Sequence, residues 1–281
     1  MYQIIGKKNL GEGINLYNIS APDVALKALP GQFIILRVNK NGERIPITIA
    51  NSDKNDKTIT ILVQTLGKTT HLLSELNVGE SLADLVGPLG VPTEIKKFGT
   101  VVCIGGGFGT AAIYPIAKAM KAEGNRVISI IGARSKELLL MEDEMKAASS
   151  EVLAATNDGS YGTKGIVTDV LRNLIYDKKI QIDRVIAIGP VIMMKAVSDL
   201  TKEKSIKTIV SLNPIMIDGT GMCGACRVLV GNKTKFACVD GPDFDGHLVD
   251  FDNLMSRLKF YKEEEKTSYD CHMKAHHNLT S

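Results

Sequence analysis

Tryptophan is absent from this 281-residue sequence, and aromatic residues make up only 5% of it. No apolar run approaches the about 18 residues of a membrane-spanning helix, so no membrane span is expected. The sequence lacks basic blocks interleaved with aromatics, and its net charge is only +3, which argues against a nucleic-acid partner. Its first residues lack a signal-peptide layout. With 44% hydrophobic and 23% charged residues, it has the composition of an ordinary globular protein of one or two domains.

Cysteine is also scarce in the sequence. There are five cysteines, an odd number, and Cys223, Cys226 and Cys238 lie close together near the carboxyl terminus. Such a set fits a metal site in a reducing compartment better than a framework of disulfides, and we therefore expect a cytoplasmic protein. Cys103 lies inside a predicted apolar strand, where a buried packing role is more usual than a redox role.

The clustered cysteines follow the pattern C-x2-C-x11-C, and four residues separate Asp218 from the first of them. The plant-type spacing for a [2Fe–2S] cluster is C-x4-C-x2-C with a distant fourth cysteine, so Asp218 stands in the place of the first cysteine. Soft sulfur donors select zinc, copper(I) or iron–sulfur clusters, and a carboxylate is a harder donor that would make the cluster more labile. We predict a [2Fe–2S] cluster held by Asp218, Cys223, Cys226 and Cys238.

Two other interpretations of this stretch remain open. Another residue, such as Cys271, could complete a cluster or a zinc site in place of Asp218. Alternatively, the segment could be a reduced, metal-free knuckle of small residues, because its glycines allow tight turns without any metal.

Residues 1–97 contain short β-branched, apolar segments separated by turn signals such as Pro30-Gly31 and Asn41-Gly42. This spacing of segments and turns is typical of an antiparallel barrel or sandwich. Strands are predicted at 34–38, 46–50 and 58–64, and a short helix at 69–76.

Two features of this first part suit phosphate. Arg44 leads a segment that also offers the Thr48 hydroxyl, and an arginine at a strand edge can hold a phosphate through two parallel hydrogen bonds. Gly67 precedes the predicted helix, where the N–H groups of the first turn suit a pyrophosphate. Taken alone, an arginine such as Arg44 is more often a solvated strand charge, and a threonine such as Thr69 is more often an ordinary helix cap.

Between residues 98 and 213, apolar strands alternate with helices, which is typical of a parallel sheet covered on both faces. Strands are predicted at 100–104, 127–131, 152–155, 185–188 and 208–212, and helices at 111–122, 137–148, 167–175 and 191–201.

A glycine-rich turn from Gly105 to Thr110 follows the first of these strands and predicts dinucleotide binding. Its spacing is G-x-G-x-G, not the standard G-x-G-x-x-G. Arg134 and Ser135, rather than an acidic residue, follow the second strand. A cation and a hydroxyl could accept a 2′-phosphate, so the choice between NAD and NADP stays open on these residues alone.

The carboxyl-terminal part predicts a small hairpin at 227–230 and 235–238 and a helix at 252–261. The remaining polar tail is expected to extend from the body of the protein. Its Cys271, His272, His276 and His277 could form a metal tract, although a solvated tail, ordered by a partner, is the simpler interpretation.

These pieces occur in the order β-barrel, parallel α/β domain and cysteine-rich carboxyl terminus. That order resembles the ferredoxin-NADP reductase superfamily, as do Arg-x-Pro-Ile-Thr (44–48), Gly-Lys-Thr-Thr (67–70), Gly-Gly-Gly-Phe-Gly-Thr-Ala (105–111) and Asp-Gly-Thr-Gly-Met-Cys-Gly-Ala-Cys (218–226). Within it, the chain resembles the electron-transfer subunits of dihydroorotate dehydrogenase. It is more similar still to the small subunits of NADH-dependent reduced ferredoxin:NADP oxidoreductase, also called sulfide dehydrogenase β-subunits, which it resembles in having an aspartate at position 218.

The resemblance, which covers residues 1–262, implies the fold class and the cofactors. The expected parts are a FAD-binding antiparallel β-barrel (1–97), an NAD-binding parallel α/β domain (98–213), a [2Fe–2S] segment (214–262) and a polar tail (263–281). The residues expected to bind FAD and NAD(H) are Arg44, Pro46, Ile47, Thr48, Gln64, Gly67, Thr69, Thr70, Gly105, Gly106, Gly107, Gly109, Thr110, Arg134, Asp158 and Gly189.

The function implied is that of an oxidoreductase subunit which moves electrons between NAD(H), FAD and the cluster. The resemblance also implies a larger flavin and iron–sulfur partner, similar to the small subunit of glutamate synthase. In that family the complex couples NADPH oxidation to reduction of NAD+ and ferredoxin, with the bifurcating flavin in the partner. No catalytic acid or base is expected, because a hydride moves directly between rings. The alternatives are a dihydroorotate or sulfide/polysulfide oxidoreductase subunit and a non-redox zinc-knuckle interaction module.

Overall fold

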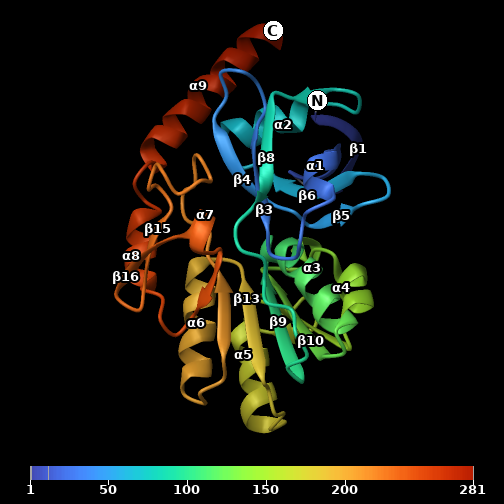
Figure 1. Ribbon diagram of the computed structural model, residues 1–281, viewed down its shortest axis with the longest axis vertical. Coiled ribbons are helices and arrows are strands. Elements are labelled where there is room, and N and C mark those ends of the chain that lie inside the picture. Colours follow the sequence, from blue (N-terminus) through green and yellow to red (C-terminus); the bar gives the residue numbers. More distant parts are fainter. Residues whose placement is uncertain (1, 12, 281) are drawn as a thin grey trace.

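The computed structural model describes residues 2–11 and 13–280, and the side chains of all of these except residues 275–280. Figure 1 shows a barrel at the amino-terminal end, an α/β domain beneath it, and a small carboxyl-terminal segment that lies beside both. These three parts confirm the predicted fold class and the order of its pieces.

The barrel consists of two antiparallel sheets with the strand orders β5-β6-β2-β1-β7 and β4-β3-β8. Inward-facing residues of both sheets form one apolar core, in which Ile34, Leu36, Ile59 and Ile61 are fully buried. The elements are β1 (Tyr2–Gly11), β2 (Ile14–Ser20), α1 (Pro22–Ala25), β3 (Phe33–Arg37), β4 (Arg44–Thr48), β5 (Asn51–Asp53), β6 (Thr58–Gln64), α2 (Lys68–Glu75), β7 (Ser81–Leu82) and β8 (Asp84–Leu89).

The predicted strands and helix of this part are confirmed as β3, β4, β6 and α2. Strands β1, β2 and β8 were not predicted. The sequence of β1 is largely polar because most of its side chains are exposed or half-buried, so it lacks the apolar alternation that marks the other strands.

The second sheet has the order β12-β11-β10-β9-β13-β14-β17, with β17 as an antiparallel edge strand and all other pairs parallel. Helices α3 and α4 pack on one face, and α5 and α6 on the other. The elements are β9 (Thr100–Gly106), α3 (Gly109–Ala122), β10 (Arg126–Ala133), η1 (Lys136–Leu138), α4 (Glu142–Ala148), β11 (Glu151–Thr156), β12 (Thr163–Lys164), α5 (Val167–Arg172), η2 (Asn173–Asp177), β13 (Arg184–Ile188), α6 (Val191–Lys202), β14 (Thr208–Ser211) and β17 (Asp243–Asp245).

The helix predicted at 137–148 is wrong in its first half. The structure has the short 3-10 turn η1, then a break, and α4 begins only at Glu142. Met141 adopts a left-handed conformation with φ of 55°, and Leu140 is buried. Tertiary packing of these apolar residues therefore overrides a pattern that locally matches a helix.

The carboxyl-terminal segment contains a hairpin of β15 (Arg227–Val230) with β16 (Lys233–Phe236), then α7 (Ala237–Asp240), β17 and α8 (Phe251–Arg257). The first strand is confirmed, but the second, predicted at 235–238, begins and ends two residues earlier, and Cys238 lies on α7. The carboxylate of Asp250 caps α8 by accepting from the N–H of Asn253 at 2.9 Å. The helix predicted at 252–261 is thus confirmed in position but ends earlier.

The tail does not extend freely from the body, as was expected. It forms α9 (Lys262–Thr280), which packs against α2 of the barrel. Figure 1 shows this helix running along the outside of the barrel to the end of the molecule that also holds the N-terminus. A polar helix gives no core-facing pattern, so its position could not be predicted.

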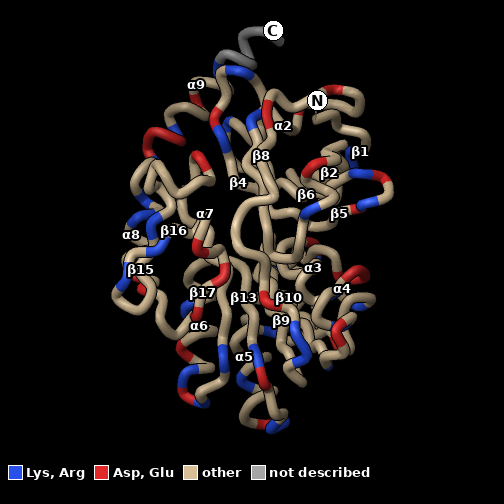
Figure 2. Tube along the Cα trace, in the orientation of Figure 1, with Lys and Arg blue, Asp and Glu red and all other residues tan. Residues whose placement is uncertain are grey.

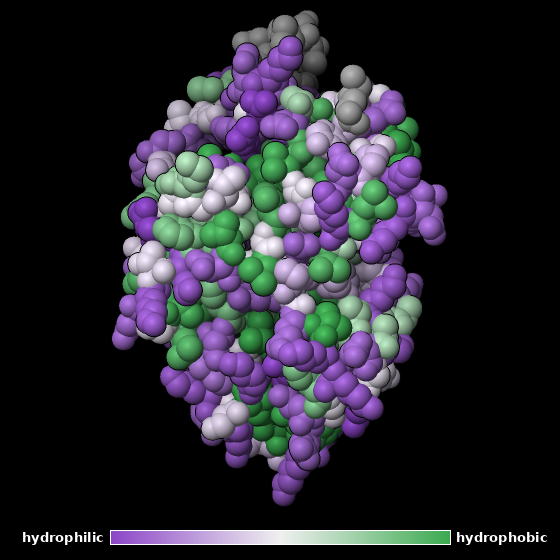
Figure 3. Space-filling view, viewed as in Figure 1, coloured by the Kyte–Doolittle hydropathy of each residue, from purple (hydrophilic) through white to green (hydrophobic). Residues whose placement is uncertain are grey.

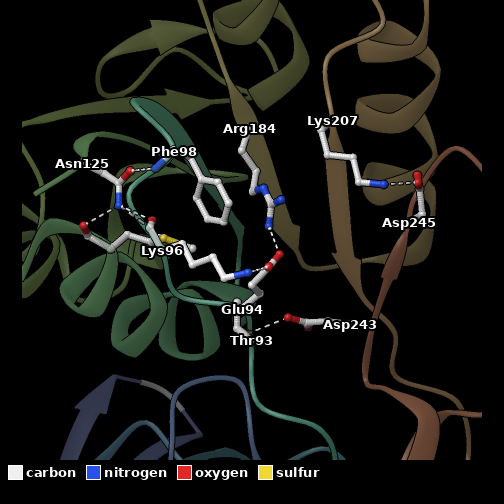
Figure 4. Close-up of polar contacts among 10 residues, drawn as sticks. Thr93, Glu94, Lys96, Phe98, Asn125, Arg184, Lys207, Asp243 and Asp245 are labelled. Atoms are coloured by element: carbon white, nitrogen blue, oxygen red, sulfur yellow. Dashed lines mark hydrogen bonds and ion pairs between the residues drawn. The ribbon is translucent and has the colours of Figure 1, made fainter. Parts of the chain in front are cut away.

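The linker between the barrel and the α/β domain is held by side chains of the second domain (Figure 4). Asn125 accepts from the N–H of Phe98 at 2.6 Å and donates to the carbonyl of Lys96 at 2.9 Å. The Arg184 guanidinium lies 3.0 Å from the Glu94 carboxylate and 3.7 Å from the centroid of the Phe98 ring. These contacts orient the two domains around the site between them.

The same junction contains a carboxyl group in a low-dielectric setting, that of Asp243 on β17. Its Oδ2 accepts from the hydroxyl of Thr93 at 2.6 Å. Its Oδ1 is buried, although the residue as a whole keeps some exposure. Burial raises the pKa of Asp243 above its ordinary value of 3.8.

Replacing Asp243 by asparagine should flatten the pH dependence of stability. Because the pKa is raised in the folded protein, the folded state holds this proton when the unfolded state has lost it. The free energy of unfolding therefore falls as the pH rises from the ordinary carboxyl pKa through the raised one. Asp243→Asn, which stays neutral, should gain on the wild type over that window by about 1.4 kcal/mol for each unit of the pKa difference. Urea unfolding of the holoprotein between about pH 4 and 7 measures this.

A matched control lies two residues further along the same strand. This control is Asp245. Partial burial raises the pKa of its carboxyl, but the hydrogen bonds from Lys207 and from the His247 N–H outweigh that effect and lower it. Asp245→Asn should therefore lose stability relative to the wild type as the pH rises. Slopes of the same sign for both variants would contradict the assignment of a buried, proton-retaining carboxyl to Asp243.

Candidate functional site

A cavity of about 1210 Å³ lies between the barrel and the α/β domain. Sites for one small ligand usually measure about 300–1,000 Å³, so this cavity has room for an extended cofactor. Its walls come from β4, β6 and the start of α2, from the carboxyl ends of β9, β10, β11 and β13, and from α9. The predicted cofactor residues that line it are Pro46, Ile47, Thr48, Gln64, Gly67, Thr69, Thr70, Gly106, Gly107, Gly109, Arg134 and Gly189.

The start of α2 forms the barrel side of this cavity. Gly67 is the extended N-cap residue, and its N–H donates to the Thr70 hydroxyl at 3.0 Å. A Cβ built on Gly67 would meet no atom within 4 Å. The first turn of a helix presents backbone N–H groups and the positive end of the helix dipole. With no side chain in the way, this turn fits a diphosphate.

Arg44 lies outside the cavity lining. Its guanidinium is 3.4 Å from the Asp84 carboxylate, and its side chain is 41% exposed. The neighbouring Glu43 was not predicted, yet it lines the cavity and accepts from the Thr69 hydroxyl at 3.0 Å. The strand-edge arginine is thus placed in a surface ion pair, and the hydroxyl of Thr69 is turned toward a carboxylate.

The second wall lies where the strand order of the parallel sheet reverses, between β9 and β13. Ligands of such sheets bind at this point, outside the carboxyl ends of the strands. The segments that follow β9 and β13 approach each other closely here. A Cβ on Gly106 would lie 2.3 Å from Met193 Sδ, and a Cβ on Gly109 would lie 2.1 Å from Ile188 O. Gly107 differs, because its φ is +53° and a Cβ there would meet nothing within 4 Å. That space is available to a nucleotide.

The other predicted residues that do not line the cavity support the turns beside it. A Cβ on Gly105 would lie 2.7 Å from Thr110 Cα, and Thr110 is buried. Asp158 accepts from the hydroxyl and the N–H of Ser160 at 2.6 and 2.9 Å, and these hydrogen bonds lower the pKa of its carboxyl.

Several lining residues were not predicted. Most follow the carboxyl ends of parallel strands, and this position alone could have identified them. They are Asn157, Pro190, Ile192, Met193, Ser211 and Asn213.

The predicted cluster ligands form an inner and an outer pair. The Sγ atoms of Cys226 and Cys238 lie 3.2 Å apart, and both residues are buried. Cys223 is exposed. The Asp218 carboxylate accepts from the N–H groups of Thr220 at 2.9 Å and Cys223 at 2.7 Å. These hydrogen bonds lower the pKa of Asp218, so its carboxylate is ionised at neutral pH.

This donor set fits a thiophilic metal centre. Burial raises the pKa of Cys238 to about 12, and the hydrogen bond with the Cys226 thiol acts in the same direction. Two adjacent buried thiols become thiolates only for a cation that displaces their protons. A two-iron cluster takes two ligands on each iron, which suits two pairs of donors better than four donors converging on one point. Cys271, the alternative fourth ligand, lies on α9 and is exposed.

The cluster loop touches the barrel beside the cavity. A Cβ on Gly219 would lie 2.6 Å from Leu89 Cδ1 and 2.8 Å from Ile35 Cδ1. Ile35 pairs directly with Pro46 in the antiparallel register of β3 and β4, and Pro46 lines the cavity. Side chains of such a pair lie on the same face of the sheet, about 5 Å apart. The cluster loop and the cavity are therefore neighbours on one face.

Helix α9 contributes a wall that no motif indicated. Its first two turns line the cavity, and Tyr269 lies edge-on to His71 of α2 with ring centroids 6.3 Å apart. The lining residues from α9 are Lys262, Glu265, Lys266, Ser268 and Tyr269.

Comparison with known proteins identifies the two cofactor-binding parts. A family model for the iron–sulfur cluster binding domain of dihydroorotate dehydrogenase B matches residues 213–250, and one for the oxidoreductase FAD-binding domain matches residues 2–92. The chain is 47% identical over 272 residues to the dihydroorotate dehydrogenase B (NAD(+)) electron transfer subunit homolog of Thermotoga maritima, covering 97% of this chain and 95% of that protein. The chain belongs to the family of dihydroorotate dehydrogenase B electron-transfer subunits.

Two further relatives place this electron-transfer subunit within its superfamily. It is 34% identical over 221 residues to the dihydroorotate dehydrogenase B (NAD(+)) electron transfer subunit of Fusobacterium nucleatum, covering 76% of this chain and 83% of that protein. It matches a chain of the solved NADH-dependent reduced ferredoxin-NADP oxidoreductase, from work on flavin-based electron bifurcation, with a TM-score of 0.92, 43% identity, and 97% and 98% of the two chains covered.

The predicted resemblance is therefore confirmed. The electron-transfer subunit is a flavo-iron–sulfur oxidoreductase subunit with a FAD-binding barrel and a carboxyl-terminal cluster-binding domain. The matches favour this interpretation over the zinc-knuckle alternative. In the part of the chain that the structure describes, no helix is both long enough and apolar enough to cross a membrane.

Proposed function

We propose that this electron-transfer subunit moves electrons between NAD(H), FAD and a [2Fe–2S] cluster, as one arm of a bifurcating NADH/NADPH/ferredoxin transhydrogenase complex. The observation that carries the proposal is the contact of the cluster loop with β3, beside the strand that lines the cavity. When bound, FAD supplies the exchange between paired electrons of a nicotinamide and single electrons of a cluster. The chain's own residues set the distance, exclude water and orient the rings.

The cavity divides into a FAD half and a nicotinamide half. On the barrel side, β4 and β6 offer Pro46, Ile47, Thr48 and Gln64 to a flavin ring, and the start of α2 offers its N–H groups to the diphosphate. On the other side, the glycine turn after β9 and Gly189 after β13 leave room for the nicotinamide nucleotide. The two ring systems would then meet between the domains, where no acid or base is needed.

For the cluster, the burial pattern supports a set of ligands in two pairs. Cys226 and Cys238, which are adjacent and buried, would hold the inner iron, and Cys223 and Asp218 the outer iron. An outer carboxylate next to solvent is the more labile corner of such a site. The same corner is the natural exit for electrons toward a partner.

The surface of this chain around Cys223 and Asp218 is suitable for docking a larger partner subunit. Met222, immediately before Cys223, is 88% exposed, and Ile217 and Val239 are 48% and 44% exposed. Apolar side chains around a redox centre favour docking that excludes water. We propose a partner with its own flavin and iron–sulfur clusters, through which ferredoxin and NADPH react, in the reducing cytoplasm.

The choice of NAD(H) is tested by single-turnover reduction of the subunit under anaerobic conditions. NADH should bleach the flavin band rapidly, and NADPH should do so slowly. Arg134→Ala should leave the NADH rate unchanged, because NADH has no 2′-phosphate for this cation to bind. If NADPH is the faster reductant and loses about tenfold or more in Arg134→Ala, as expected for a lost charge-assisted hydrogen bond, the NAD(H) assignment is wrong.

The relatives also favour a second candidate, in which the partner is a dihydroorotate-oxidising subunit. Asp218 argues against this candidate. The all-thiolate pattern has a cysteine at the position that Asp218 occupies in this chain. Affinity purification from the source cell distinguishes the two. A partner that oxidises dihydroorotate would replace the transhydrogenase proposal.

A further inference from the structure

Three side chains with metal-binding atoms converge outside the flavin cavity. His71 and Glu75 lie on α2, and His272 comes from α9. His71 Nδ1 lies 3.3 Å from His272 Nε2 and 3.6 Å from Glu75 Oε1, and the three ligand atoms lie within 4.8 Å of one another. The two histidines are 201 residues apart in the sequence.

These distances suit one small cation. Tetrahedral zinc with Zn–N and Zn–O bonds of about 2.0–2.2 Å holds neighbouring ligand atoms about 3.3–3.6 Å apart. Two imidazoles and one carboxylate are a donor set that zinc accepts, and imidazole in general selects Zn, Cu, Ni or Fe over Mg or Ca. On α2 the pair has the i,i+4 spacing that brings two ligands to one helix face.

Partial burial supports a defined geometry at this place. The side chains of His71 and Glu75 are 19% and 36% exposed, and His272 is half-buried. The ring of His71 lies edge-on to both Tyr269 and His272, with centroids 6.3 and 5.2 Å away. The three rings therefore pack together at the contact of α2 and α9.

Few other contacts hold the part of helix α9 whose side chains the structure describes. From Lys262 to Lys274 no residue is buried, and only Ser268, Tyr269, His272 and Met273 are half-buried. Figure 2 shows charged residues along this helix, and Figure 3 shows a mainly hydrophilic surface at this end of the molecule. Since a polar helix gains little from burial, a cross-link is the interaction that would fix it.

We propose that His71, Glu75 and His272 bind a divalent transition-metal ion of the zinc class, which clamps α9 onto α2. The clamp lies just outside the flavin cavity. Thr70, which precedes His71, and Tyr269, three residues before His272, both line that cavity. The metal would therefore hold one wall of the flavin site in place. His276 and His277, the rest of the histidine tract, lie outside the side chains that the structure describes.

The experiment is a zinc titration of the holoprotein, loaded with FAD and cluster so that the cysteine site is filled. Calorimetry should show one zinc per chain. His71→Gln, Glu75→Gln and His272→Gln should each weaken zinc binding by more than about 100-fold, since even outer-shell partners of a metal are worth 10–100-fold. Zinc should slow amide hydrogen exchange in α9 of the wild type and not in His272→Gln.

Two matched variants test whether the effect belongs to these ligands. His247→Gln, at a histidine of the α/β domain that bonds Thr201, should bind zinc like the wild type. His272→Cys should keep binding and show one sulfur in place of one nitrogen among the zinc ligands seen by X-ray absorption. That gain of signal does not depend on a loss of folding.

Three results would overturn the clamp. One is the absence of any zinc binding in the filled holoprotein, which would leave a hydrogen-bonded His–Glu–His network. Another is unchanged affinity in His71→Gln and Glu75→Gln, which would mean that the carboxyl-terminal histidines bind zinc without α2. The third is zinc that binds with no change in hydrogen exchange of α9.

Discussion

Cys238→Ala is expected to leave the electron-transfer subunit with no cluster, lowering its iron from about two per chain to none while FAD remains bound. The thiol it removes is buried and 3.2 Å from that of Cys226, so the two thiols form one buried pair. Without Cys238, only Cys226 of the buried pair would be left to hold the inner iron, and we expect the whole cluster to be lost.

The measurement combines iron and sulfide analysis with the visible spectrum of the anaerobic protein. Cys271→Ser is the matched control, because it removes an exposed cysteine of α9 and should leave the iron unchanged. Iron that survives in Cys238→Ala, or disappears in Cys271→Ser, would refute the inner pair and revive Cys271 as a ligand.

Substitutions of Asp218, the outer carboxylate ligand, should change the lifetime of the cluster without abolishing it. Asp218→Cys restores the all-thiolate pattern and should make the cluster last longer in air, whereas Asp218→Ala should shorten its life. In both variants the inner pair is intact, so the cluster should still assemble under anaerobic conditions. Equal lifetimes in all three proteins would show that Asp218 only stabilises the loop through its hydrogen bonds to Thr220 and Cys223.

Gly67→Val should weaken FAD binding by about 100-fold or more without unfolding the protein. The backbone of Gly67 is extended, a conformation that valine adopts readily, and a Cβ there meets no atom within 4 Å. The new side chain would fill the space in front of the first turn of α2. A diphosphate would then lose two or more charge-assisted hydrogen bonds, each worth about 1.5 kcal/mol or more.

Fluorescence titration of the apoprotein with FAD measures this affinity, and circular dichroism follows the fold. Gly11→Val is the matched control, since a Cβ on Gly11 also meets nothing within 4 Å and Gly11, on β1, does not line the cavity. A normal FAD affinity in Gly67→Val would place the diphosphate elsewhere. The prediction would also fail if Gly11→Val lost FAD to the same extent.

Local patterns account for what could be predicted. Apolar runs such as 100–104 and 185–188 marked the buried parallel strands, because a strand covered on both faces needs apolar side chains at every position. The cysteine spacing marked the cluster loop, because ligands within a few residues of each other are brought together by the loop itself. The glycine turns were visible for the same reason, although Gly106 and Gly109 turned out to serve the close approach of two turns.

Long-range packing accounts for what could not be predicted. Strand β1 carries little apolar alternation, and the helix pattern at 137–148 is broken where Leu140 turns into the core. Arg44 stays a predicted phosphate ligand, and its ion pair with Asp84, which depends on the pairing of β4, β3 and β8, could not be predicted from its local pattern. Helix α9 has no apolar stripe from which its docking on α2 could be inferred.

The sequence by itself therefore determined the chemistry of this electron-transfer subunit: the sulfur and carboxylate donors, the glycine turns for phosphate, and the order of its parts. Only the tertiary structure decided how these groups work together. It set Gly219 against Ile35, beside the strand that lines the cavity, and it brought His272 to His71. Donor type and turn geometry depend on a few neighbouring residues, whereas each of these contacts depends on how whole elements pack, which no local pattern records.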